Sequence, residues 1–148
     1  MKITEKDVLF EDNHLIAVNK SAGILTQSDY RGEESLQEMI KTYLKEKYAK
    51  PGNVYLGIVH RLDMGVSGVN IFAKTDKAAA RLSKLIRERN FLKLYVALSH
   101  YSSYAQSAQM KNEKFYMGRE RDFSFVKSSA SPGLDSASLS YKTLCATD

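Results

Sequence analysis

The chain of 148 residues is 43% apolar and 26% charged, with a formal net charge of +5, a balance typical of one globular domain with its own core. No window approaches the roughly 20 apolar residues needed to cross a bilayer, and the N-terminus lacks the apolar segment of a secretory signal, so a membrane span is excluded. The single Cys145 cannot form an intrachain disulfide, which favours a reducing, cytoplasmic setting. We expect one domain over residues 1–148.

The first predicted elements are a hairpin and a helix. Residues 8–11 and 14–19 read as two strands joined by a turn at Asp12 and Asn13, residue types that accept turn geometry. Residues 33–50 carry apolar side chains at helical spacing, with a Ser35 and Glu38 pair that fits a capping box and a Pro51-Gly52 stop. The pattern predicts an amphipathic helix that packs on a sheet.

A charged cluster interrupts the apolar pattern between two further strands. Residues 55–59 read as a buried strand and residues 69–74 alternate as a second one, so Asp63 falls in a tight connection between them. An alternative interpretation is structural, because aspartate and glycine are common turn residues for backbone reasons alone. In that case Asp63 is a turn residue, His60 a half-buried strand histidine and Arg61 a solvated charge.

The wider motif favours a catalytic interpretation. The run His60-Arg61-Leu62-Asp63, followed by Ser67-Gly68 and by residues 72–75, closely resembles the signature of the RluA-type pseudouridine synthases, enzymes that isomerise uridine in RNA. The resemblance implies that Asp63 is the catalytic nucleophile and that Arg61 contacts RNA. Residues 19–25 resemble the element that opens this family's catalytic domain, with Ser21 in place of a proline.

A second helix is expected over residues 76–90, with its start capped by Thr75 or Asp76 and a buried stripe of alanine, leucine and isoleucine. Residues 74–95 hold seven basic side chains against two acidic ones, the footprint of a surface that binds a polyanion or, alternatively, of a solvated helix face. Steps of four and three residues align Lys77, Arg81 and Lys84 on one face, which predicts phosphate contacts there.

Residues 91–99 alternate as a strand with Lys93 and Tyr95 side by side. Residues 93–97 resemble the family's Lys-x-Tyr-x-Ala motif, which implies that Tyr95 lines the active site and stacks on the target base. His60 is expected to shape the strand end or to contact a phosphate. The predicted RNA-contacting residues are therefore Arg61, His60, Lys77, Arg81, Lys84 and Lys93, with Asp63 and Tyr95 as catalytic residues.

The rest of the chain gives weaker signals. Residues 101–109 and 128–133 read as loops, and residues 114–118, 122–127 and 138–144 as strands. With the resemblance, these elements imply an α+β fold, a mixed and largely antiparallel sheet with flanking helices, incomplete at the C-terminus. The family's later motif, whose arginine pairs with the catalytic aspartate, has no counterpart before residue 148. We therefore expect a truncated domain that self-associates through exposed sheet edges.

The motif raises three possible functions. Uridine isomerisation in tRNA or rRNA needs no cofactor, and the carboxylate can act as a nucleophile on the ribose C1′ or as a base at the 2′ position; the residues leave both routes open. The alternative is a catalytically inactive relative that only binds RNA. A hydrolase using Asp63 and His60 is disfavoured, because neither a second carboxylate nor metal-ligand spacing accompanies them.

Overall fold

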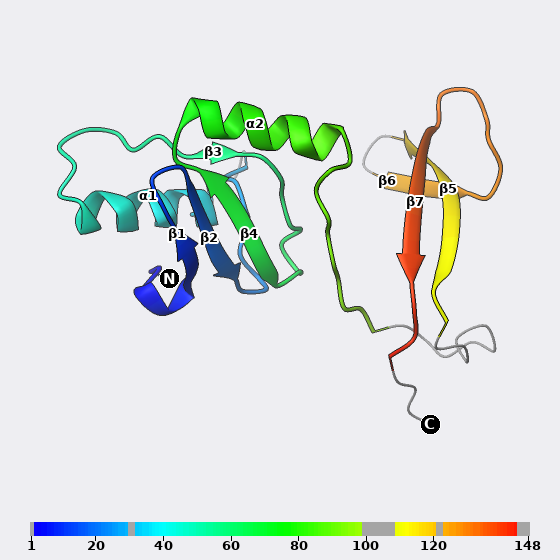
Figure 1. The fold of residues 1–148 in the computed structure, drawn as a ribbon, viewed down its shortest axis with the longest axis horizontal. Coiled ribbons are helices and arrows are strands. Elements are labelled where there is room, and N and C mark those ends of the chain that lie inside the picture. Colours follow the sequence, from blue (N-terminus) through cyan, green and yellow to red (C-terminus); the bar gives the residue numbers. More distant parts are fainter. Residues whose placement is uncertain (1, 30–31, 99–108, 121–122, 145–148) are drawn as a thin grey trace. The chain divides into compact units, whose positions relative to one another are not determined.

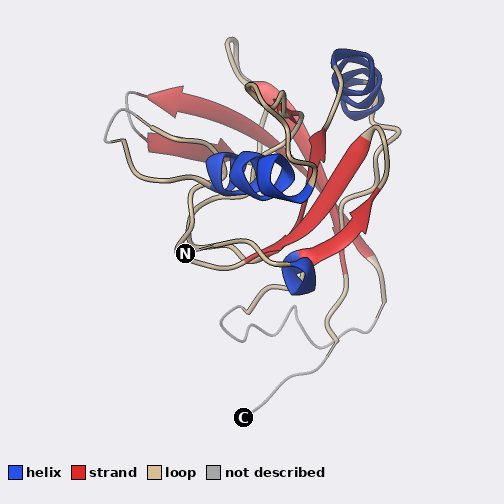
Figure 2. Cartoon of the chain, turned by 90° about the vertical axis from the view of Figure 1, so that its left-hand side faces the viewer, coloured by secondary structure: helices blue, strands red, loops and turns tan. Residues whose placement is uncertain are grey.

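The computed structural model describes residues 2–29, 32–98, 109–120 and 123–144 (Figure 1). The chain divides into two compact units, residues 1–94 and residues 95–148, and each is considered by itself. Both are built from antiparallel strands, drawn in red in Figure 2. Among the described residues, both α-helices belong to the first unit. This confirms the predicted α+β class. The prediction of a single domain stays a prediction.

The first unit holds a four-stranded sheet in the order β1-β2-β4-β3. Its strands are β1 (Val8–Glu11), β2 (Leu15–Lys20), β3 (Gly57–Ile58) and β4 (Gly68–Ala73), and a 3-10 turn, Glu5–Asp7, precedes them. The predicted hairpin is confirmed. Its turn forms because the Asp12 carboxylate accepts hydrogen bonds from the amides of His14 and Leu15, at 2.7 and 2.6 Å.

Helix α1 (Leu36–Lys47) supplies half of the core. Ser35 caps its start by accepting a hydrogen bond from the Glu38 amide, whereas the Glu38 carboxylate pairs with Lys41 rather than closing a capping box. The helix ends three residues before the predicted limit, because Ala49 adopts a left-handed φ of 46° ahead of the proline. Its buried face packs with β2 and β4 in one cluster that includes Ile16, Val18, Leu36, Met39, Ile40, Tyr43, Leu44 and Phe72.

One buried carboxylate ties the end of β1 to the ends of α1 and β4. The Glu11 side chain, 8% exposed, accepts hydrogen bonds from Lys74 at 2.6 Å, Lys47 at 2.9 Å and the Tyr48 hydroxyl at 2.8 Å. Burial alone raises the pKa of such a group, but these donors outweigh it and lower the pKa of Glu11 to about 2. Lys74, part of the family-like motif, therefore serves the fold.

Strand β3 is shorter than the predicted strand over residues 55–59. Beyond its two residues, side chains replace the main-chain hydrogen bonds of a longer strand pair. Gln37 donates to the Leu56 carbonyl at 2.7 Å, and His60 accepts from the Ile71 amide at 3.0 Å. Gly57 also permits a close approach of the second helix, because a Cβ there would lie 3.1 Å from the Cβ of Ala79.

Helix α2 (Asp76–Arg87) confirms the second predicted helix, with Thr75 as its cap. It contacts β3 and β4, and Figure 1 shows α1 and α2 flanking the sheet. The stripe of α2 predicted to be buried is less buried than expected. Ala78 is buried, Ala79, Leu82 and Ile86 are half-buried, and Leu85 is exposed. Helical spacing shows which side chains share a face but not how completely a neighbour covers that face.

The strand predicted over residues 91–99 is wrong for its described part. Residues 92–98 form no strand, and their side chains are exposed. A strand needs a partner for its main-chain groups, and alternating side chains do not provide one. Residue 99 and most of the predicted loop 101–109 lie outside the described residues.

The second unit is a three-stranded sheet in the order β6-β5-β7. Its strands are β5 (Lys111–Glu120), β6 (Phe123–Lys127) and β7 (Asp135–Tyr141). All three predicted strands are confirmed, with β5 longer and β7 starting three residues earlier than expected. Gly118 on β5 makes room for a neighbour, because a Cβ there would lie 2.4 Å from the Phe125 ring.

Candidate active site

Asp63 lies in the connection between β3 and β4, as the sequence predicts, and the loop presents it to solvent. The side chain is exposed, and the Asp63 carbonyl accepts a hydrogen bond from the Val66 amide at 3.0 Å, which closes a tight turn. An exposed carboxylate at the tip of a short turn is reachable by a macromolecular substrate.

The residues on either side of Asp63 are held in place through their main chains. Thr26 is hydrogen-bonded to both the amide and the carbonyl of Leu62, at 3.2 and 2.8 Å. The Met64 carbonyl accepts from the Gly23 amide at 2.8 Å and from Lys20 at 3.2 Å. Gly23 reaches this position with a φ of 87°, a conformation that favours glycine. Asp63 therefore projects between two anchored peptides.

Lys20 is a buried cation that the sequence reasoning did not select. It ends β2 opposite Gly68, its side chain is fully buried, and its Nζ donates to the carbonyls of Ser21, Ile24 and Met64 at 3.1, 2.7 and 3.2 Å. Burial lowers the pKa of Lys20, while attraction from the charge of Asp63 opposes that shift. The sequence did hold one signal for such a role, because Lys20 directly follows the apolar strand predicted over residues 14–19.

His60 has a structural partner. Its Nε2 accepts the Ile71 amide, so the proton of the neutral imidazole lies on Nδ1, and its ring lies 6.0 Å from that of Phe91. Burial, and secondarily the charge of Lys93, lower the pKa of His60. The geometry supports shaping of the strand end. A phosphate contact for His60 stays a prediction.

The other predicted RNA-contacting residues lie on the surface. The side chains of Arg61, Lys77, Arg81, Lys84 and Lys93 are exposed. Lys84 pairs loosely with Glu88 at 3.8 Å, with both side chains well solvated. Lys74 does not belong to this surface, because its side chain is 11% exposed and is bound to Glu11.

Tyr95 begins the second unit, where its side chain is 63% exposed in the segment without strand pairing. Its predicted role in stacking on a base stays a prediction. Sequence reasoning assigned Tyr95 to a strand that does not form there.

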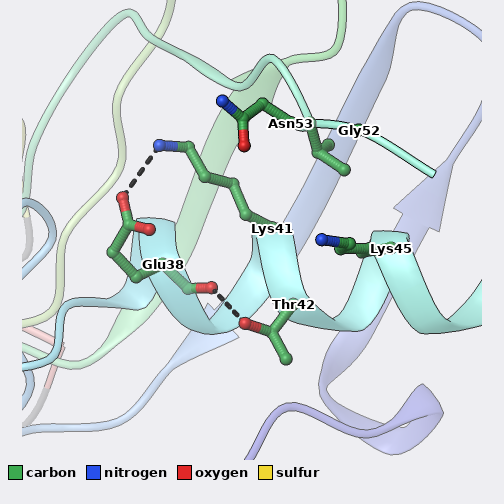
Figure 3. A pocket seen from close by; sticks show the side chains of 7 residues that line it. Glu38, Lys41, Thr42, Lys45, Gly52 and Asn53 are labelled. Carbon is green, nitrogen blue, oxygen red and sulfur yellow. Dashed lines mark hydrogen bonds and ion pairs between the residues drawn. The ribbon is translucent and has the colours of Figure 1, made fainter. Parts of the chain in front are cut away.

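A shallow pocket lies elsewhere in the first unit. It has a volume of about 360 Å³ and is lined by residues of α1 and by residues 52–54 (Figure 3). Lys41 bonds Glu38 across its wall, and Lys45 and Asn53 border it (Figure 3). None of the predicted site residues lines this pocket.

The described residues offer neither a metal cluster nor a membrane-spanning helix. Across the four described ranges, no three histidine, cysteine, aspartate or glutamate side chains gather as a metal ion would require. Neither helix of the described residues has the length and apolar character needed to cross a lipid bilayer.

Comparison with known proteins identifies the family of the chain. The model of a family described as RNA pseudouridylate synthase matches residues 14–144. The chain belongs to this RNA pseudouridylate synthase family. The match includes the Asp63 loop, helix α2 and all three strands of the second unit.

Several curated relatives resemble this family member. The dual-specificity RNA pseudouridine synthase RluA of Vibrio vulnificus is 36% identical over 91 residues, which cover 62% of this chain and 34% of the relative. The ribosomal large subunit pseudouridine synthase C of Buchnera aphidicola is 36% identical over 93 residues, or 63% of this chain and 28% of the relative. An uncharacterised RNA pseudouridine synthase of Bacillus subtilis, YhcT, is 29% identical over 140 residues, or 95% of this chain and 44% of the relative.

A solved structure shares the fold. The human RNA pseudouridylate synthase domain containing 4 matches 96% of this chain and 55% of its own with a TM-score of 0.66, at 17% identity. The likeness supports the fold alone. In these curated matches the chain spans about a third to less than half of the relatives' length.

Proposed function

We propose that the protein isomerises uridine to pseudouridine in structured RNA, tRNA or rRNA, with Asp63 as the catalytic nucleophile. The observation that carries the proposal is the position of Asp63 in a family member: its carboxylate is exposed, while both neighbouring peptides are anchored by buried groups. Fixed geometry at a reacting atom reduces the entropy that the reaction must otherwise overcome.

The reaction breaks the bond between the uracil N1 and the ribose C1′, turns the base, and joins C5 to the same C1′. The proton on C5 leaves and N1 gains one, so no oxidant, reductant or energy source is consumed. Ionised Asp63 assists either by attacking C1′ to form a covalent sugar intermediate or by removing the 2′ proton to give a glycal. Lys20 is buried behind the loop, and its positive charge and the charge of Asp63 attract each other.

The target base must leave the RNA stack to reach a carboxylate on a surface loop, at a cost of a few kcal/mol. Arg61, two residues before Asp63 and exposed, is suited to contact the opened strand. Tyr95 is the aromatic side chain that we expect to stack on the flipped uracil. The exposed cations Lys77, Arg81 and Lys84 on α2, together with Lys93, would hold the phosphate backbone.

The experiment that tests the nucleophile measures release of tritium from RNA labelled at the uracil C5, with unfractionated tRNA and rRNA as substrates. Asp63→Asn in the full-length protein should abolish release, because the amide neither attacks C1′ nor accepts the 2′ proton. Asp135→Asn is the matched control, since Asp135 is an exposed aspartate on β7. Full activity of Asp63→Asn would refute the assignment. RNA binding by the unaltered protein without any release would favour the inactive RNA-binding alternative.

A second experiment tests the α2 surface. Replacing Lys77, Arg81 and Lys84 by alanine should weaken RNA binding and lower the magnitude of its salt slope by about two to three, since each duplex phosphate contact contributes about 0.9. Lys6→Ala combined with Lys45→Ala is the control, because these exposed lysines lie on other elements. An unchanged slope in the triple variant would remove α2 from the interface.

A further inference from the structure

Two polar side chains lie in the core directly behind the Asp63 loop. Thr26 is 3% exposed and Asn70, on β4, is fully buried. Asn70 shares a strand face with Phe72, which belongs to the apolar cluster packed by α1. Polar groups in such surroundings are costly unless they are hydrogen-bonded, so their contacts indicate what they do.

The Thr26 hydroxyl is fully used. It donates its one hydrogen to the Leu62 carbonyl at 2.8 Å and accepts from the Leu62 amide at 3.2 Å and from the Asn70 Nδ2 at 3.3 Å. A hydroxyl offers one donor and two lone pairs, and here all three are occupied. One side chain thus binds both main-chain groups of the residue immediately before Asp63.

The Asn70 side chain has only part of its hydrogen-bonding capacity used among the described residues. Its Nδ2 donates to Thr26, whereas its Oδ1 is buried without a hydrogen-bond partner among the described residues. A leucine of similar size would fill this place without leaving a buried acceptor unpaired, which normally costs free energy. The hydrogen bond from the Asn70 Nδ2 to the Thr26 hydroxyl is the contact that explains an asparagine at this position, and it orients that hydroxyl.

We propose that Thr26, oriented by Asn70, is a positioning residue for Asp63. By fixing the Leu62 peptide, it sets the direction in which the Asp63 side chain leaves the loop. Lys20 and the Gly23 amide fix the Met64 peptide on the other side. The inference rests on the proposed role of Asp63 for its catalytic consequence, but the anchoring itself is open to a separate measurement.

The first measurement is hydrogen exchange of the chain. In Thr26→Val, a nearly isosteric change that removes only the hydroxyl, the Leu62 amide should lose its protection while amides in the β2 and β4 ladder keep theirs. Thr26→Ser should preserve the protection. Retained protection in Thr26→Val would overturn the anchoring, and loss of ladder protection as well would show a general loss of folding instead.

The second measurement is single-turnover release of C5 tritium by the full-length protein with tRNA and rRNA. Thr26→Val should slow the step by on the order of ten- to a hundredfold with little change in RNA affinity, as expected for a small misplacement of a reacting group. Thr26→Ser should recover most of the rate. Ile40→Val controls for a slightly destabilised core, since Ile40 is buried on α1 and its apolar side chain offers no group to hydrogen-bond the loop.

Asn70→Leu separates positioning from stability. The melting temperature should stay the same or rise, because the unpaired Oδ1 is removed, whereas the single-turnover rate should fall by a smaller factor than in Thr26→Val. Unchanged rates in both variants would overturn the proposal. If Asp63→Asn were active while the Leu62 amide still depended on Thr26, the anchoring would stand and the nucleophile assignment alone would fail.

Discussion

Replacement of Glu11 by glutamine tests how strongly the buried ion cluster holds the first unit together. The Glu11 carboxylate is 8% exposed and accepts hydrogen bonds from Lys74, Lys47 and the Tyr48 hydroxyl. These contacts lower its pKa from the ordinary 4.5 to about 2, against the opposing effect of burial. Such a difference corresponds to about 3 kcal/mol of stability carried by the ionised form, at about 1.4 kcal/mol per pKa unit.

The sign follows from the lower folded-state pKa. The stabilisation is complete above the unfolded value of 4.5 and is lost as the pH falls toward about 2. Denaturant unfolding of the unaltered protein and of Glu11→Gln should therefore differ by about 3 kcal/mol at pH 7 and by about 1.5 kcal/mol at pH 3. Glu46→Gln is the control, because its exposed pair with Lys2 should contribute less than about 1 kcal/mol.

A constant difference between the unaltered protein and Glu11→Gln across that pH range would refute the reasoning. It would mean that the carboxylate contributes through packing rather than through charge. A difference no larger than that of Glu46→Gln would show that burial of Glu11 cancels the gain from its three donors.

Three further changes have defined outcomes. Lys20→Met removes an ammonium that three carbonyls accept, and should lower the free energy of unfolding by about 3 kcal/mol and reduce C5 tritium release more than RNA affinity. Gly57→Ala should cost about 1–3 kcal/mol by pressing on α2, whereas Gly52→Ala, which has open space, should be neutral in thermal melting. Because burial lowers the folded-state pKa of His60, the free energy of unfolding should fall as the pH drops below about 6.5. Measured from pH 8 to pH 5, this pH dependence should disappear in His60→Asn and persist in the control His14→Asn. An unchanged pH dependence in His60→Asn would contradict the reasoning.

Elements that depend on neighbouring residues in the chain were predictable. The hairpin follows from local turn chemistry at Asp12, and both helices follow from their periodicity and from caps at Ser35 and Thr75. Prediction failed where the outcome depends on a distant partner. Residues 92–98 alternate correctly but form no strand, and β3 stops early because His60 takes the place of a main-chain acceptor.

The candidate site was predictable where it depends on a local motif and not where it depends on distant residues. The motif around Asp63 identified the exposed loop, but not the groups behind it, because Thr26 and Lys20 reach that loop across 36 and 44 positions of sequence. One signal was present in the alternation of residues 69–74, where Asn70 falls on the same face as Phe72. An asparagine at a core position indicates a specific buried partner but does not reveal which one.

Hydrogen bonds to main-chain groups on both sides of Asp63, at Leu62 and at Met64, hold the loop that carries it. The side chains of Arg61, Met64 and Val66 are exposed and take no part in that anchoring. Under the proposed function, anchoring of the carboxylate and contact with the RNA would therefore use different atoms of the same few residues. Substrate preference could therefore be altered at positions 61, 64 and 66 while the carboxylate keeps its place.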